Sequence, residues 1–580
     1  MTEHHGEREP WWEREWEWER GALAGRGGGG QGGRHRPVRW SAVSGPVQRW
    51  RARGFLRPPA HPAQRGSAQG DRPLDGRLRQ LRERRNGGRV TAGIGGPGEP
   101  YTPEAALPPD ESDAPTTPAT PTTPEIPKDT EILEDAEILE DTELPEDLEV
   151  PEFQEVPKVS AVPRLPEVPD VFHPRRYVKG LPHDAYRLLR DHHPVAWQDE
   201  PEVLGWPAGP GFWAVTRHRD VVRVLKDART FSSQLGATQI RDPDPVDLPF
   251  IRRMMLNQDP PEHGRLRRLV SRAFTPRRVD RFETAVRERA RALLTTAVHT
   301  ARSGDGGCDV VSTVTDDYAL LNLADLLGVP PGERGLMLDW TRRVIGYQDP
   351  DEAGPAATGT DGRPADPRSP AMLQDMFAFA RELAAHKRRY PGDDVMTVLA
   401  TDPELAVPEL EMFFFLLTIA GNDTVRSAAP GGLLALARHP DGYAALRRGA
   451  VAVGPAVEEL LRWHPPVLSF RRTAAADTEL AGRRIRAGDK VVVFHGSANY
   501  DERVFADPGR LDLARSPNPH VSFGDGPHVC LGAHLARLQL RVLYEETCAL
   551  LPAVAVAGPP QRLVSNFIHG LKSLPLRLAT

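Results

Sequence analysis

The sequence has few cysteines and no excess of basic residues. Only three of its 580 residues are cysteines, too few for a disulfide framework. Such a low number is typical of proteins from a reducing compartment, so we expect a cytoplasmic protein. The formal net charge is −6. The composition therefore gives no basic surplus of the kind that indicates nucleic-acid binding.

Long apolar runs are also missing. The most apolar stretch, residues 412–421, spans about ten residues, whereas a membrane-spanning helix needs roughly 20. The N-terminal sequence MTEHHGEREPWWEREWEWER lacks the basic start and the apolar core of a secretory signal. These two absences predict a protein without stable membrane insertion.

Composition divides the chain into three parts. Residues 1–89 form a low-complexity extension rich in Gly and Arg, and residues 90–168 are rich in Pro, Thr and Glu, with the near-repeat TEILED, AEILED, TELPED. Both parts bury too little apolar surface to offset the entropy of ordering, so we expect them to be disordered. Residues 1–89 also resemble translated upstream sequence, and a translation start near Val90 is the alternative interpretation.

Residues 169–580 have the pattern of a globular domain. Apolar residues recur at helical spacing in many segments, for example residues 185–189 and 457–463. Only a few short runs are typical of strands, notably residues 211–215 and 490–494. The sequence therefore predicts a mainly α fold with small β-sheets.

The strongest chemical signal is residues 523–532, FGDGPHVCLG. Three glycines and a proline predict a tight loop, and apolar spacing predicts a helix over residues 531–543. Cys530 would then lie at a helix N-terminus, where the helix dipole favours a thiolate, and a thiolate is a good ligand for haem iron.

Two other interpretations of this cysteine remain open at the level of the residues. It could be a buried packing cysteine, as we expect for Cys308 and Cys548. A His-x-Cys pair could also bind zinc, but no second pair lies at the spacing that a zinc site needs.

Residues 523–532 resemble the haem-binding loop of the cytochrome P-450 family, F-G-x-G-x-H-x-C-x-G, at every fixed position. The resemblance implies the fold of that family, with haem b (heme b) between a long distal helix and a proximal cysteine loop. It also implies Cys530 as the iron ligand and His528 as a propionate contact. The family's remaining loop positions that contact haem correspond to Phe523, Gly524 and Gly532.

Two further segments resemble the family's haem-propionate contacts. Residues 259–267 match D-P-P-x-H-x-x-x-R, which implies roles for His263 and Arg267. Without the resemblance, these would be solvated residues on a basic helix. Arg472 fits the place of the family's propionate-binding arginine better than Arg471, by its spacing to Asp477.

Glu459 and Arg462 lie three residues apart on a predicted helix and so share a face. Such a pair is usually a surface ion pair worth under about 1 kcal/mol. Here it resembles the family's structural E-x-x-R, whose third member is an arginine in a P-x-R segment. The sequence Pro508-Gly509-Arg510 predicts Arg510 for this role.

Residues 420–424, AGNDT, resemble the family's distal motif A-G-x-[DE]-T. The small Ala420 and Gly421 would let a flat cofactor approach. The resemblance gives Asp423 and Thr424 catalytic roles, the threonine orienting oxygen and the acid relaying protons, although a lone threonine commonly bonds its own helix. Pro430 predicts a bend or an early end of this helix.

The resemblance implies a monooxygenase that inserts one atom of O2 into a C–H bond of an apolar molecule. Residues 254–259, 420–426 and 565–572 resemble actinobacterial sterol and methyl-branched lipid hydroxylases. Ile419, Val467, Leu468 and Phe567 are the expected pocket residues, with ordinary core packing as the alternative. No flavin or nicotinamide segment follows the haem segment, so we expect a separate ferredoxin and ferredoxin reductase as partners.

Three other functions stay open. The first is a hydroxylase that tailors a natural product, and the second is a haem-thiolate enzyme of coupling or rearrangement. The third is a haem-based sensor. Asp423 and Thr424 argue against the last two, because oxygen activation needs such a pair most. The sequence gives no indication of an oligomer.

Overall fold

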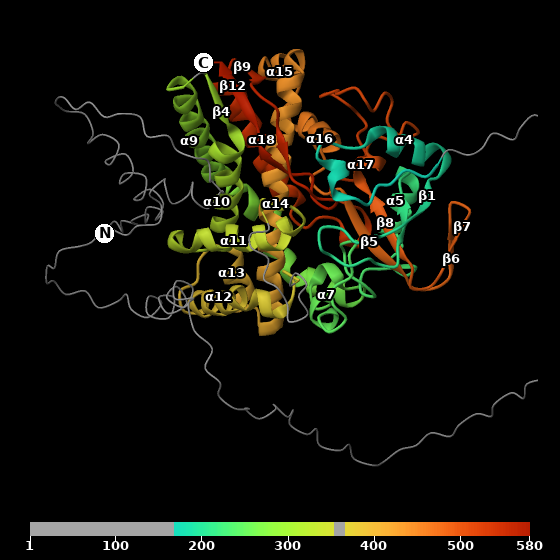
Figure 1. Ribbon diagram of the computed structural model, residues 1–580. Coiled ribbons are helices and arrows are strands. Elements are labelled where there is room, and N and C mark those ends of the chain that lie inside the picture. Colours follow the sequence, from blue (N-terminus) through green and yellow to red (C-terminus); the bar gives the residue numbers. More distant parts are fainter. Residues whose placement is uncertain (1–166, 305, 353–365, 580) are drawn as a thin grey trace, which may run out of the picture. The chain divides into compact units, whose positions relative to one another are not determined.

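The computed structural model describes residues 167–304, 306–352 and 366–579 (Figure 1). The predictions made for residues 1–89 and for the Pro/Thr/Glu-rich segment up to residue 166 lie outside the described residues. The predicted globular domain is observed as helices with small sheets, which confirms the expected fold class.

The α-helices are α4 (His183–His192), α5 (His218–Lys226), α6 (Leu248–Ile251), α7 (Glu262–Ser271), α8 (Pro276–Asp280), α9 (Glu283–Arg302), α10 (Asp316–Leu327), α11 (Arg334–Ile345), α12 (Pro370–Arg389), α13 (Val395–Thr401), α14 (Val407–Arg438), α15 (Pro440–Arg447), α16 (Val453–Trp463), α17 (His495–Ala498) and α18 (Ala533–Leu550). The strands are β1 (Val195–Gln198), β2 (Phe212–Val215), β3 (Phe231–Ser232), β4 (Gly307–Asp309), β5 (Ser469–Ala474), β6 (Thr478–Leu480), β7 (Arg483–Ile485), β8 (Lys490–Phe494), β9 (Ala553–Val556), β10 (Gln561–Arg562), β11 (Leu571–Ser573) and β12 (Pro575–Ala579).

The largest sheet has five strands in the order β1-β2-β8-β5-β3. It contains both predicted strands, since β2 and β8 pair in parallel. Alternation along β8 explains how the sheet is held: Val491 and Val493 pack into one apolar cluster, and Val492 and Phe494 into another. The run of four apolar residues from Val491 to Phe494 therefore buries both faces of the strand. Figure 1 shows α4 and α5 beside this sheet.

The long helix α14 runs through the helical part of the domain and packs against α10, α11, α12, α16 and α18 (Figure 1). Its first turn contains Pro408, and the Glu409 carboxylate accepts a hydrogen bond from the Ala406 N–H at 2.9 Å. Both features are typical of helix N-termini. None of the described helices is both long and apolar enough to cross a bilayer.

Of the two outcomes expected at Pro430, a bend or an early end, the early end is wrong, because α14 continues to Arg438. Close packing explains why it continues. A Cβ atom on Gly431 would lie 2.0 Å from the His464 ring, and one on Gly432 would lie 2.0 Å from the Tyr544 hydroxyl. The two glycines therefore let neighbouring helices approach closely, and this burial offsets the hydrogen bond that proline removes.

Candidate active site

The cysteine loop is closed by backbone geometry. The Cys530 N–H donates to the Phe523 carbonyl at 2.9 Å. Gly524 and Gly526 have φ of 70° and 68°, values that favour glycine. A Cβ on Gly526 would also lie 2.5 Å from the Leu225 carbonyl oxygen of α5. The shape of the loop therefore requires glycine at Gly524 and Gly526.

Helix α18 begins at Ala533, two residues later than predicted, and runs to Leu550. Cys530 precedes it, and the Gly532 N–H donates a hydrogen bond to the sulfur that lowers the thiol pKa. Burial is the larger effect and raises the pKa of Cys530 overall. The expected stabilisation by the helix end is thus too small to produce a thiolate alone. Iron would produce it, because a coordinating thiol is deprotonated.

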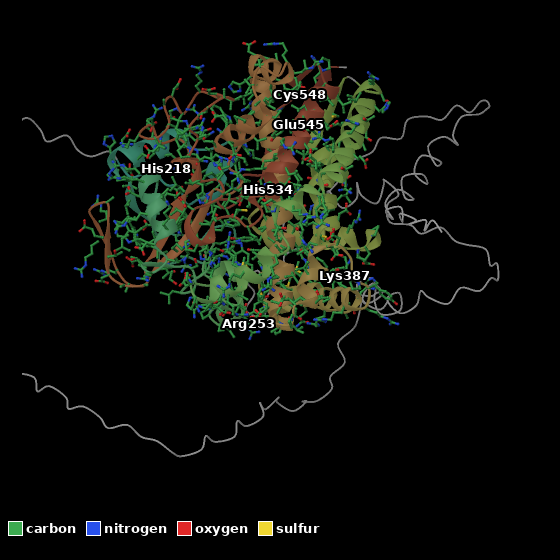
Figure 2. All side chains as sticks on the ribbon, turned by 180° about the vertical axis from the view of Figure 1, so that it is seen from behind. His218, Arg253, Lys387, His534, Glu545 and Cys548 are labelled. Atoms are coloured by element: carbon green, nitrogen blue, oxygen red, sulfur yellow. The ribbon has the colours of Figure 1, made fainter. Side chains whose placement is uncertain are left out.

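The Cys530 side chain is accessible to solvent, although desolvation is the main influence on its pKa. The sulfur is therefore poorly solvated and yet open to a ligand. Cys308 is buried, and Cys548 lies towards the end of α18, away from His534 in its first turn (Figure 2). Neither shares the loop environment of Cys530.

The Phe523 ring of the cysteine loop is in contact with a cation from α18. The Arg537 guanidinium of α18 lies 4.4 Å from the centroid of the Phe523 ring. Arg537 in turn donates to the Glu458 carboxylate of α16 at 2.7 and 2.8 Å. The positive charge of Arg537 also lowers the pKa of Cys530. Sequence reasoning missed Arg537 and Glu458, because nothing in their local pattern sets them apart from surface ion pairs.

Four basic side chains from three distant segments meet beside Cys530. The rings of His263 and His528 have centroids 4.0 Å apart and planes tilted by 36°. Arg472 is only 3% exposed, and its guanidinium donates a hydrogen bond to the Arg471 carbonyl at 2.9 Å. Arg267 is near enough to Cys530 for their charges to interact. We call His263, Arg267, Arg472 and His528 the basic cluster.

Burial opposes positive charge throughout this cluster. Burial first, and then repulsion by neighbouring cations, lowers the pKa of His528 to about 2. The pKa of His263 falls to about 4, chiefly through burial, although Asp259 partly opposes the change. Burial also lowers the pKa of Arg472, to about 10. A ligand that carries negative charge would reverse these shifts.

The donor set fits the carboxylates of a haem. Among the described residues, no carboxylate forms an ion pair with Arg267 or Arg472, and the buried His528 Nδ1 has no hydrogen-bond partner. Buried polar groups are nearly always paired, so an anionic group belongs here. Two propionates beside a cysteine ligand would satisfy the cluster.

On the distal side, α14 carries the predicted catalytic pair. The Thr424 hydroxyl donates to the Ala420 carbonyl at 2.8 Å, so the common helix-bonding arrangement of threonine is observed. This bond leaves the hydroxyl oxygen free to accept. Asp423 is 3% exposed, and its Oδ2 has no hydrogen-bond partner among the described residues. Burial raises the pKa of Asp423 to about 6, while Arg426 opposes that shift.

The two small residues of the motif face different neighbours. Ala420 is exposed although it lies in the middle of α14, so it is free to contact a cofactor. A Cβ on Gly421 would lie 2.7 Å from Leu323 Cδ1 of α10. The lack of a side chain at Gly421 therefore serves the contact between α14 and α10.

Glu459 and Arg462 form a buried ion pair, with both side chains 0% exposed and two contacts of 2.8 Å. The prediction of Arg510 as the third member is wrong. Arg515 donates to the Glu459 carboxylate at 3.1 Å, and Arg510 is exposed. The chain turns between the two arginines so that the Arg510 carbonyl accepts from Arg515 at 3.0 Å, which sequence spacing alone did not reveal.

The expected apolar pocket residues divide into two groups. Leu468 is 0% exposed and packs in a core cluster of the five-stranded sheet, so it has the environment of a core residue. Ile419 and Phe567 are half-buried and available to a substrate. Phe470, which sequence reasoning missed, packs edge-on against Phe567 with centroids 5.6 Å apart. Val467 is 8% exposed, so it belongs with Leu468 among the buried residues.

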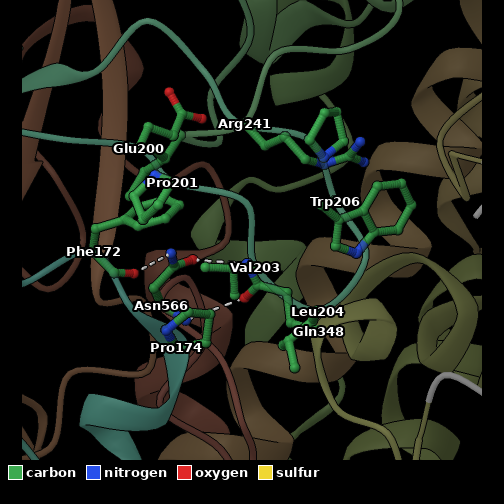
Figure 3. Close-up of a pocket in the computed structure, with 12 residues that line it drawn as sticks. Phe172, Pro174, Glu200, Pro201, Val203, Leu204, Trp206, Arg241, Gln348 and Asn566 are labelled. Atoms are coloured by element: carbon green, nitrogen blue, oxygen red, sulfur yellow. Dashed lines mark hydrogen bonds between the residues drawn. The ribbon is translucent and has the colours of Figure 1, made fainter. Parts of the chain in front are cut away.

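A small pocket is lined by Asn566, the residue before Phe567 (Figure 3). Asn566 donates to the Phe172 carbonyl at 2.7 Å and accepts from Gln348 at 3.0 Å. The Arg241 guanidinium covers the Trp206 ring at 3.8 Å from its centroid. The lining of this pocket contains none of the residues of the cysteine loop or the basic cluster. We therefore do not assign the catalytic reaction to this pocket.

Comparison with known proteins supports the same family. The family model described as cytochrome P-450 matches residues 393–547. The methyl-branched lipid omega-hydroxylase of Mycobacterium tuberculosis is 39% identical over 398 residues, covering 68% of this chain and 90% of the relative. The steroid C26-monooxygenase of Rhodococcus jostii is 35% identical over 419 residues, covering 71% of this chain and 85% of the relative.

Solved structures agree with these relatives. A Mycobacterium marinum cytochrome P-450 in complex with pseudoionone is 39% identical, with a TM-score of 0.60 over 68% of this chain and 94% of its own. A protein from Novosphingobium aromaticivorans is 31% identical, with a TM-score of 0.62 over 71% of this chain and 99% of its own. The chain therefore belongs to the cytochrome P-450 family of monooxygenases, whose haem iron is ligated by cysteine.

Proposed function

We propose that Cys530 ligates the haem iron and that the basic cluster binds the haem propionates. One observation carries this proposal: four basic side chains gather beside Cys530, and no described carboxylate forms an ion pair with either arginine. The bound haem supplies oxygen activation, which a thiolate ligand favours by donating electron density. Phe523, Gly524 and Gly532 shape the loop that presents the sulfur.

The distal residues would manage protons. Asp423 exchanges a proton near neutral pH, because burial raises its pKa to about 6, and a general acid works best with a pKa near the operating pH. Thr424 would accept a hydrogen bond at the site of oxygen activation while its own hydroxyl donates to the Ala420 carbonyl. Ala420, which is exposed in the middle of α14, would face the cofactor, whereas Gly421 allows the close contact with α10.

The reaction we propose is hydroxylation of an apolar substrate. One atom of O2 enters a C–H bond, and the other leaves as water after the uptake of two electrons and two protons. We propose that the electrons come from a ferredoxin and its reductase in the cytoplasm.

A sterol or a methyl-branched lipid is the substrate class we favour. Relatives whose names give such substrates are 39% and 35% identical to this chain. The half-buried apolar side chains Ile419, Phe470 and Phe567 suit a long apolar molecule. Tailoring of a natural product is the second candidate, because a structure from vancomycin-type antibiotic biosynthesis is also similar, at 28% identity.

Product analysis tests this choice. The enzyme, supplied with ferredoxin and reductase, would be given a sterol and a methyl-branched fatty acid, and products would be located by mass spectrometry. We expect oxidation at a terminal carbon of at least one substrate. Phe567→Ala should weaken substrate binding roughly tenfold, since the loss of a half-buried aromatic contact costs about 1.4 kcal/mol at that fold-change. If the enzyme oxidises neither the sterol nor the methyl-branched fatty acid, the proposal is contradicted.

The domain assignment is also a proposal. Residues 169–580 would form the haem domain, with 90–168 as a disordered segment and 1–89 as an extension that is disordered or untranslated. Intact mass of the natively expressed protein separates the last two interpretations. A mass that includes Trp11 and Trp12 would contradict a start near Val90.

A further inference from the structure

Behind Asp423 lies a buried charged group that the haem site does not use. Arg426, three residues further along α14, contacts Asp423 Oδ1 at 3.4 Å and donates from Nε to Asp316 Oδ1 of α10 at 2.7 Å. Glu352 is close enough for its charge to raise the pKa of Asp423. Arg342 of α11 lies 3.4 Å from Glu352. We call these five residues the distal charge cluster.

The charges in this cluster do not balance. It holds three carboxyl groups, on Asp316, Glu352 and Asp423, and two guanidinium groups, on Arg342 and Arg426. The exposed fractions of these side chains are only 4% to 13%. Full ionisation would leave one negative charge in excess in a poorly solvated place, so uptake of one proton is favourable.

Asp423 is the member best suited to take up that proton. Arg426 lies closer to Asp316, at 2.7 Å, than to Asp423, at 3.4 Å. Glu352 has Arg342 as its own partner. Asp423 keeps one buried oxygen with no hydrogen-bond partner among the described residues. Asp423 therefore shares its guanidinium partner, Arg426, with a carboxylate that lies closer to it, whereas Glu352 does not share Arg342 with another member of the cluster.

We propose that Asp316, Arg426 and Glu352 are positioning residues that make Asp423 the proton-exchanging member of the cluster and return a proton to it after each transfer. This inference rests on the proposed role of Asp423 in oxygen activation. One proton leaves the Asp423 carboxyl towards Thr424, and one proton from solvent replaces it. No electrons move within the cluster, and its net charge is restored.

The test measures the proton on Asp423 without turnover. Infrared difference spectra between acidic and alkaline pH, in H2O and D2O, report the C=O stretch of a buried protonated carboxyl. We expect one such band with a midpoint near pH 6 that is lost in Asp423→Asn. Glu352→Gln removes a like charge and should lower the midpoint by about one pH unit, a tenfold change in proton affinity.

Two further variants guard against misfolding as an explanation. Asp316→Asn frees Arg426 to pair with Asp423 and should also lower the midpoint. Glu411→Gln is the matched control, because Glu411 pairs with Arg381 at the far end of α14; its midpoint should equal that of the unsubstituted protein. The coupling of O2 use to product should shift its pH profile in the same direction as the infrared midpoint.

A band that is absent from the unsubstituted protein, or one that Glu352→Gln and Asp316→Asn leave unchanged, would overturn the inference. These results are independent of whether the haem is thiolate-bound. A normal carbon monoxide spectrum with no infrared band would reject the distal charge cluster alone. An intact band without thiolate ligation would reject the proposed function and leave the cluster standing.

Discussion

The proximal and distal sides of the site differ in how the chain builds them. On the proximal side, ten consecutive residues make the loop around Cys530, and two of its glycines have the positive φ that the turn requires. On the distal side, Asp423 depends on Asp316, Arg426 and Glu352, which come from α14 and from two separate segments before it. A site made of consecutive residues can be recognised as a sequence motif. A site made of residues from separate segments can be recognised only once the fold is known.

The largest expected effect comes from the buried pair that supports the proximal loop. Arg462→Leu leaves Glu459 buried without its bidentate partner, and we expect a loss of about 3–5 kcal/mol in the free energy of unfolding. Denaturant unfolding measures this loss. Arg515→Gln should also destabilise the protein, while Arg510→Gln should change little. Equal effects at Arg510 and Arg515 would contradict the corrected assignment.

The next effect concerns the distal pair. Thr424→Ala removes the hydroxyl, so we expect product formation per O2 consumed to fall roughly tenfold to a hundredfold, with more peroxide released. Thr424→Ser keeps a hydroxyl and should restore most of the coupling. Unchanged coupling in Thr424→Ala would show that the proton-relay assignment is wrong.

A substitution in the basic cluster should stabilise the apoprotein but weaken haem binding. Arg472→Leu removes a buried cation that has no ion-pair partner among the described residues, so the apoprotein should become more stable. Haem affinity should fall by about 1.5–3 kcal/mol, because a charge-assisted hydrogen bond is lost. Haem titration and apoprotein unfolding measure the two effects.

The neighbouring arginine is the matched comparison for this change. Arg471 pairs with Asp242, so Arg471→Leu should destabilise the apoprotein and affect haem binding less. A stabilised Arg471→Leu apoprotein, or equal losses of haem affinity in the two variants, would contradict the assignment of Arg472 to the propionates.

The smallest effect is a pH dependence of stability. The folded-state pKa of Asp423 is raised from 3.8 to about 6, so its ionisation costs stability as the pH rises through this interval. Asp423→Asn should therefore stabilise the apoprotein by about 1–3 kcal/mol above pH 6. Below about pH 4 the two proteins should be equally stable. Unfolding at several pH values tests this, and a pH-independent difference would contradict it.

The sequence predicted what is local. The strands around residues 211–215 and 490–494, the helix before Trp463 and the mainly α class followed from periodicity. The cysteine loop followed from its glycines. Arg515 was missed because a turn of the chain, rather than spacing, brings it to Glu459. The continuation of α14 beyond Pro430 depends on His464 and Tyr544, which lie far along the chain.

The distal charge cluster was missed for the same reason. Asp316 and Glu352 have no motif around them, and only the packing of α10 and α11 against α14 brings them near Arg426. Likewise, the resemblance named single residues of the basic cluster. Their lack of carboxylate partners, which carries the proposal, appears only when the described residues are placed in space.

The most direct test of the central claim is the carbon monoxide difference spectrum of the dithionite-reduced protein, measured for the unsubstituted chain and for Cys530→Ala. We predict a Soret band at the wavelength that gives the P-450 family its name, and its loss in Cys530→Ala, with Cys548→Ala unchanged. A band that persists in Cys530→Ala, or a different Soret position in well-folded unsubstituted protein, would show that Cys530 is not the iron ligand.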